Sequence, residues 1–125
     1  MAQVYELDDG FDREVFEDAA CAFGVFDGVH LGHQAIIGGT MRTAELDRCR
    51  SVIMTFDRDP DELFAPGLKK LMTNEARIEA LAGLGVDAVV VLPFTERLSK
   101  LDAPSFLERT FGRITVGSMH VGRDF

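Results

Sequence analysis

The sequence has 125 residues, enough for one domain of ordinary size, residues 1–125, and too few for a second independent core. Hydrophobic residues make up 46% and charged residues 27%, which excludes a disordered or low-complexity chain and indicates a globular domain. With 13 Lys and Arg against 21 Asp and Glu the formal net charge is −8, so we expect no binding to nucleic acid, which needs a basic surface.

The N-terminal residues, the longest apolar run and the two cysteines together predict a cytoplasmic protein. Residues 1–10 are acidic and lack the basic-then-apolar order of a secretory signal. The longest apolar run, Ala88 to Phe94, is far too short to span a bilayer, so we expect no membrane segment. Cys21 and Cys49 form no C-x-x-C pair, which indicates two buried cytosolic thiols rather than a zinc site or a disulfide framework.

Apolar runs of strand length alternate with helical patterns along the chain. We predict strands over residues 20–26, 51–56, 87–92 and 114–122, and helices over 30–47, 74–84 and 104–112, the second capped by Thr73 and ended by Gly85. This alternation predicts an α/β fold with a mostly parallel, doubly wound sheet covered on both faces. The ligand of such a sheet binds where the winding reverses, here after Phe26 and after Val121.

The segment from Gly24 to His33 lies at that crevice and joins the first predicted strand to the first helix. Its glycines allow a close backbone approach, and a helix N-terminus offers unpaired N–H groups to an anion. His30 and His33 lie on the first helical turn and could both donate hydrogen bonds to phosphate oxygens. The same pair fits two solvent-exposed histidines or part of a metal site, although His120 is the sole remaining histidine for a third ligand.

The wording of this segment resembles a known motif. Gly24-x-Phe26-Asp27-Gly28-Val29-His30-x-Gly32-His33 resembles the motif of the H-x-G-H nucleotidyltransferase superfamily, and its Phe-Asp-Gly-Val-His form resembles the FMN adenylyltransferase module of bacterial bifunctional riboflavin kinase/FAD synthetases. Five other segments are similar to that module in the same order: Thr55-Phe56-Asp57 with Pro60 and Glu62-Leu63-Phe64, Leu71-Met72-Thr73, Leu84-Gly85-Val86-Asp87, Leu92-Pro93-Phe94-Thr95 and Val121-Gly122-x-Asp124-Phe125.

The resemblance implies a Rossmann-like nucleotidyltransferase domain that transfers AMP from ATP to FMN, with Mg²⁺, giving FAD and pyrophosphate without a covalent intermediate. It implies that His30 and His33 are catalytic and stabilise charge on the ATP phosphates. The nucleotide-binding residues would be Gly24, Phe26, Asp27, Gly28 and Gly32. The flavin-binding residues would be Pro60, Phe64, Asp124 and Phe125.

Plainer roles remain open for three of these residues. Asp27 also fits a turn or helix cap, Phe64 a lid residue folded on the core, and Asp124 a surface turn. Phe94 follows the third predicted strand, where packing explains its ring better than stacking on a ligand. We expect Lys69, Lys70 and Arg97 to be solvated.

The chain departs from the family pattern in two places. Where the family loop reads Thr-Phe-Asp/Glu-Pro-His-Pro, this chain has Arg58 in place of the first proline and Asp59 in place of the histidine. We expect Arg58 to loosen the loop, and Asp59 to bring negative charge toward bound polyphosphate. The sequence stops at Phe125, so we expect a C-terminally incomplete domain without the family's Ser-Ser-Thr-x-x-Arg motif and without the riboflavin kinase domain. The last strand would then form an exposed sheet edge, which favours association of two copies.

These departures keep other functions open. The alternative is a catalytically silent module that binds a nucleotide or flavin on the same fold. A third hypothesis retains the H-x-G-H chemistry with another acceptor, as in cytidylyltransferases and in pantetheine-phosphate or nicotinamide-mononucleotide adenylyltransferases. Their wording before the first histidine and in the later segments differs from the wording of this chain.

Overall fold

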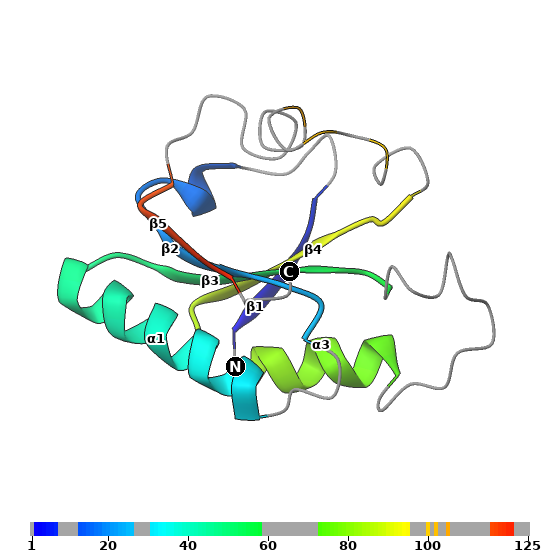
Figure 1. The fold of residues 1–125 in the computed structure, drawn as a ribbon, viewed down its shortest axis with the longest axis horizontal. Coiled ribbons are helices and arrows are strands. Elements are labelled where there is room, and N and C mark those ends of the chain that lie inside the picture. The colour runs from blue at the N-terminus through cyan, green and yellow to red at the C-terminus, as the bar shows by residue number, and fades with distance from the viewer. Residues whose placement is uncertain are drawn as a thin grey trace.

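The computed structural model describes residues 2–7, 13–26, 31–58, 73–95, 100, 102, 105 and 116–121. In chain order its elements are β1 (Gln3–Glu6), the short 3-10 helix η1 (Arg13–Phe16), β2 (Ala20–Phe23), α1 (Leu31–Asp47), β3 (Ser51–Phe56), α3 (Asn74–Ala82), β4 (Ala88–Leu92) and β5 (Ser118–Val121). Figure 1 shows α1 and α3 below the strands.

The five strands form one parallel sheet in the order β1-β4-β3-β2-β5. The chain winds from β2 through β3 to β4 in one direction, and β5 lies on the other side of β2. The winding therefore reverses between β2 and β5, which confirms the doubly wound fold. The crevice expected at such a reversal lies at the carboxyl ends of these two strands.

The core has one layer on each face of the sheet. On one face Ile37 of α1 and Leu81 of α3 pack against the strands, around Ile53. On the other face Phe16 of η1 packs against Met54 and its neighbours. All positions of β2, β3 and β4 are buried, and strands buried on both faces need apolar residues at every position, so the continuous apolar runs are explained.

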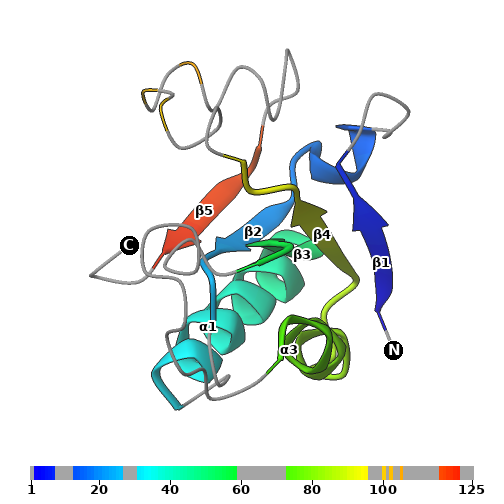
Figure 2. The same cartoon turned by 90° about the vertical axis from the view of Figure 1, so that its right-hand side faces the viewer.

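The expected coverage of both faces by helices is confirmed only for one face within the described residues. Figure 2, in which α1 and α3 are seen on the same side of the sheet, shows this arrangement. Two successive right-handed crossovers that advance in one direction place their helices on the same side. The opposite face is covered in the described part of the chain by η1, which the sequence does not predict.

Strand β1 is also missing from the sequence prediction. It pairs in parallel with β4, with Gln3 opposite Ala88 and Glu6 opposite Val91, and forms one edge of the sheet. Three of its four side chains are exposed and the fourth is partly buried. Its place in the sheet therefore depends on backbone pairing, which leaves little trace in residue types.

Several predicted boundaries also differ. Strand β2 ends at Phe23 rather than at residue 26, because the chain bends at Gly24 and Phe26 adopts a positive φ of 58°. Thr73 is confirmed as the N-cap of α3 and accepts a hydrogen bond from the Ala76 N–H at 3.1 Å. That helix ends at Ala82, two residues before the predicted end.

The last part of the prediction is tested only in part. Strand β5 covers Ser118–Val121, which is shorter than the predicted strand over residues 114–122. It lies at the other edge of the sheet, as expected for the last strand. The predicted helix over residues 104–112 lies outside the described residues, apart from the helical residue Ser105.

Candidate functional site

Four of the predicted site residues belong to the described part of the chain: Gly24, Phe26, Gly32 and His33. The other seven lie outside the described residues: His30, Asp27, Gly28, Pro60, Phe64, Asp124 and Phe125. The four described residues gather where β2 ends and α1 begins. The structure thus brings the described half of the motif to the carboxyl edge of the sheet, beside the reversal between β2 and β5.

Phe26 connects the end of β2 to His33. It has left-handed backbone geometry, with φ of 58°, and its side chain is only 3% exposed. Its ring lies edge-on to the imidazole of His33, with 5.3 Å between ring centroids and an angle of 81° between planes. Such edge-to-face pairs are favourable, and a buried ring has little freedom to move. Phe26 therefore holds His33 in a defined orientation on the first turn of α1.

Gly24 makes room for that aromatic ring. A Cβ atom at this position would lie 3.0 Å from Cζ and 3.1 Å from Cε1 of Phe26. The Gly24 N–H donates to the Met54 carbonyl at 3.2 Å and ends the pairing of β2 with β3. Among the described residues, the close approach that this glycine permits is to Phe26. Its predicted contact with a nucleotide stays a prediction.

The N-terminus of α1 has the electrostatic character of an anion site. The first turn of the helix contains no acidic residue, so no carboxylate within that turn offsets the positive end of the helix dipole. Gly32 is exposed and His33 is half-buried on this turn. Backbone N–H groups of a first helical turn and an imidazole are suitable donors to phosphate oxygens. The arrangement can accept a phosphate group at the edge where His33 lies.

Arg77 of α3 is a site feature that the sequence prediction missed. Its side chain is only 1% exposed. Nη1 donates to the Val25 carbonyl at 2.8 Å and to Thr55 Oγ1 at 2.6 Å, and Nη2 donates to the Phe56 carbonyl at 2.7 Å and to Asn74 Oδ1 at 3.4 Å. A signal was available, since Arg77 precedes the buried Leu81 by one helical turn and so lies on the buried face of a helix.

The segments after β3 and β4 are tied together by polar contacts. The Asp57 N–H donates to the Leu92 carbonyl at 2.8 Å, and Asp57 Oδ1 accepts from the Phe94 N–H at 2.9 Å. Arg58 Nε donates to the Phe94 carbonyl at 3.1 Å. Arg58, which we expected to loosen the loop after β3, thus adds a hydrogen bond between this loop and the segment after β4. The Phe94 ring is buried at 5.0 Å from the Phe56 ring, as expected for a packing role.

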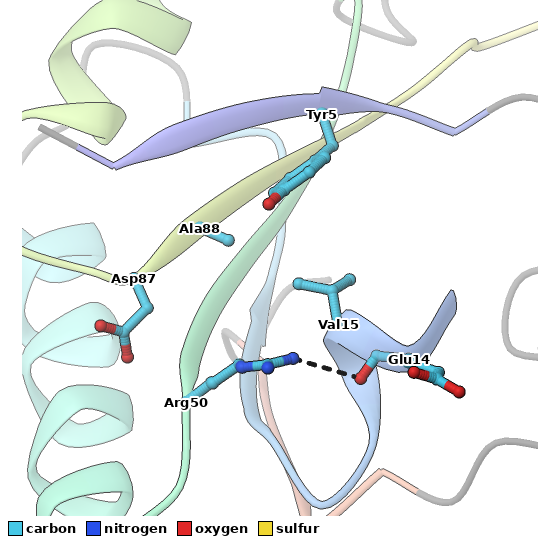
Figure 3. A pocket seen from close by; sticks show the side chains of 6 residues that line it. All are labelled: Tyr5, Glu14, Val15, Arg50, Asp87 and Ala88. Carbon is cyan, nitrogen blue, oxygen red and sulfur yellow. Dashed lines mark hydrogen bonds between the residues drawn. The ribbon is translucent and has the colours of Figure 1, made fainter. Parts of the chain in front are cut away.

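A pocket of about 440 Å³ lies at the amino-terminal ends of β3 and β4, away from the carboxyl ends where the motif lies. It is lined by Tyr5, Glu14, Val15, Arg50, Asp87 and Ala88. Figure 3 shows Arg50 extending toward the Glu14 carbonyl, to which its Nη1 donates at 3.4 Å. Asp87 Oδ2 accepts from the Ser51 N–H at 2.8 Å, so this carboxylate aligns the starts of the two strands. His33, the described histidine of the motif, lies at the other end of the strands, at the start of α1.

The described residues provide no preformed metal centre. Within them, no three His, Cys, Asp or Glu side chains gather closely enough to hold a metal ion. His120 lies on β5, where its Nε2 is 3.1 Å from Ser118 Oγ. The same part of the chain contains no helix that is long and apolar enough to cross a membrane.

Comparison with known proteins agrees with this geometry. The family model described as FAD synthetase matches residues 12–125. This chain belongs to the FAD synthetase family. The match includes the whole motif after β2, both histidines among its residues, and the segment up to residue 125.

Curated relatives of this chain are named bifunctional riboflavin kinase/FMN adenylyltransferase. The relative from Pseudomonas fluorescens is 38% identical over 115 residues, which cover 90% of this chain and 37% of the relative. The relative from Listeria monocytogenes is 34% identical over 107 residues, covering 83% of this chain and 34% of the relative. The chain thus spans about a third of the length of these relatives.

A solved structure supports the fold independently. The crystal structure of a macrolide-efflux protein from Streptococcus pneumoniae matches with a TM-score of 0.73 at 21% identity, over 98% of this chain and 41% of that chain. At this identity the likeness shows the arrangement of strands and helices alone. It agrees with the parallel, doubly wound sheet described above.

Proposed function

We propose that this chain is the adenylyltransferase part of a FAD synthetase and transfers AMP from ATP to FMN. A phosphate oxygen of FMN would attack the α-phosphorus of ATP, the bond to the β,γ-diphosphate would break, and FAD and pyrophosphate would form. The observation that carries this proposal is His33, oriented by Phe26 at the N-terminus of α1 and at the carboxyl end of β2. The names of the curated relatives support the acceptor.

The reaction requires hydrogen-bond donors to the phosphate oxygens and positioning of the two substrates rather than a nucleophile from the protein. Charge grows on the phosphate oxygens as the bond to pyrophosphate lengthens, and fixed N–H donors stabilise that charge without reorganising. His33 and, by the resemblance, His30 would supply such donors, with the backbone N–H groups at the start of α1. Gly24, Phe26, Asp27, Gly28 and Gly32 would shape the nucleotide corner.

FMN would lie beside the loops that follow β3 and β5, which contain Pro60, Phe64, Asp124 and Phe125. Mg²⁺ would enter with the ATP phosphates and neutralise part of their charge. We further propose that the protein acts in the cytoplasm, binds no nucleic acid, and associates with a second copy through the β5 edge. The net charge of −8 and the position of β5 at a sheet edge support the last two points.

Isothermal titration of the chain with ATP and Mg²⁺, followed by FMN, tests the proposal. We expect His33→Ala to weaken ATP binding by about tenfold, since a hydrogen bond to a charged group is lost. His120→Ala is the matched control, because His120 lies on β5 and bonds to Ser118. Chromatographic detection of FAD after incubation with both substrates then tests catalysis. A folded chain that binds ATP or FMN but forms no FAD would support the catalytically silent module, and a folded chain that binds neither ligand would overturn the proposal.

A further inference from the structure

The buried guanidinium of Arg77 joins two segments that end at the functional edge of the sheet. One is the end of β2, where the Val25 carbonyl accepts from Nη1 at 2.8 Å. The other is the end of β3, where the Phe56 carbonyl accepts from Nη2 at 2.7 Å. Burial of a charge is costly unless hydrogen bonds satisfy it, so this arrangement is built around specific partners.

These contacts lie at the point where the regular sheet stops. The ladder between β2 and β3 ends with the bond from the Gly24 N–H to the Met54 carbonyl at 3.2 Å. One residue further, the Val25 carbonyl accepts from Thr55 Oγ1 at 3.2 Å as well as from Arg77. Side chains thus take over from the backbone in holding the two strand ends together.

The segments held in this way lead directly into the site. Val25 precedes Phe26, whose ring orients His33, and Phe56 precedes the Asp57 segment that is tied to the end of β4. A shift of the Val25 carbonyl would move the strained backbone of Phe26 and, with it, the packing against the imidazole. Arg77 itself stands behind the site, on α3.

We propose that Arg77 is a positioning residue of the nucleotide corner: it sets the separation of the segments after β2 and β3 and thereby the affinity for ATP. This inference rests on the proposed function. A planar guanidinium can direct its two terminal nitrogens at two carbonyl groups at once, whereas a lysine ammonium carries its donors on a single atom. Arginine is therefore required for joining both strand ends.

Two variants and one control test the inference on the full chain. Arg77→Met removes the donors and the charge, and Arg77→Lys keeps the charge but cannot span both carbonyls. Arg50→Met is the matched control, since it removes the same charge at the opposite edge of the sheet, where Arg50 is exposed. Hydrogen exchange without ligand and titration with ATP and Mg²⁺, corrected for the folded fraction, are the two measurements.

In Arg77→Met we expect exchange to accelerate about tenfold or more at residues 24–26 and 57–58, with β4 unchanged, and ATP affinity to fall about tenfold or more. Arg77→Lys should lie between wild type and Arg77→Met, and Arg50→Met should match wild type. If Arg77→Met does not fold, the result from Arg77→Lys decides.

Two results would overturn the inference. Unchanged ATP affinity in the folded Arg77 variants would leave the residue a purely structural role, as would exchange that accelerates uniformly through the sheet. Failure of the proposed function is recognised separately, because the wild-type chain would then bind no ATP. The link to affinity would fail with it, while localised exchange would still identify Arg77 as the tie between the two strand ends.

Discussion

Replacing Gly24 with alanine should distort the corner where β2 meets α1. The new Cβ atom would lie 3.0 Å from Cζ and 3.1 Å from Cε1 of Phe26, closer than carbon atoms normally approach. The ring cannot easily yield, because it is only 3% exposed and lies against His33. Overpacking of this kind costs about 1–3 kcal/mol of unfolding free energy.

Gly38 provides a control in which the same substitution has the opposite sign. It lies inside α1, and an added Cβ atom would have no neighbour within 4 Å. Alanine is the better helix former by about 1 kcal/mol, so Gly38→Ala should stabilise the chain. The two variants should therefore differ by about 2–4 kcal/mol in unfolding free energy.

Urea unfolding measures the difference, which would appear as a shift of the midpoint with the slope unchanged. For a chain of 125 residues, each kcal/mol corresponds to about 4 °C in Tm. We also expect the imidazole resonances of His33 to shift in Gly24→Ala and not in Gly38→Ala. The reasoning would be refuted if Gly24→Ala unfolded at the wild-type midpoint and left the His33 resonances in place.

Two further predictions concern other parts of the fold. Gly117→Ala places a Cβ atom 2.5 Å from the Asp18 carbonyl oxygen, a backbone atom, so we expect a loss of about 2–3 kcal/mol in urea unfolding; an unchanged midpoint would contradict this. Burial, and secondarily the charge of Cys49, raises the pKa of Cys21 from 9.0 to about 12. The Cys21 thiol stays protonated to higher pH in the folded chain than in the unfolded chain. The free energy of unfolding therefore keeps the full contribution of this thiol below pH 9. Between pH 9 and pH 12 that contribution falls by about 1.4 kcal/mol per pH unit. Urea unfolding at pH 8–10.5 should show this slope in wild type relative to Cys21→Ala, and equal slopes would exclude it.

Much of the fold could be predicted from residue patterns. The apolar runs at β2, β3 and β4 predict strands buried on both faces, and Thr73 predicts the start of α3 because its hydroxyl can accept from a first-turn N–H. Strand β1 escaped prediction because mostly exposed side chains carry no burial pattern. Its pairing is provided by the backbone of β4, which belongs to a distant part of the sequence.

The candidate site was predictable in part, from the order of neighbouring residues along the chain. The spacing of His30 and His33 after a buried strand and two glycines indicates a phosphate site, because local order is enough to place a motif at a strand end and a helix start. The pattern does not show why residue 24 must be glycine. The reason is that the Phe26 backbone is left-handed and the Phe26 ring lies against Gly24.

The sequence by itself determined the alternation of strands and helices, the family, and the position of the H-x-G-H segment in the chain. These are properties of neighbouring residues and of their periodicity. Only the tertiary structure decided that Phe26 orients His33 and that Arg77 binds the ends of β2 and β3 together. Arg77 and Val25 are 52 residues apart, and a contact between such distant residues depends on how α3 packs beneath the sheet, which no local pattern encodes.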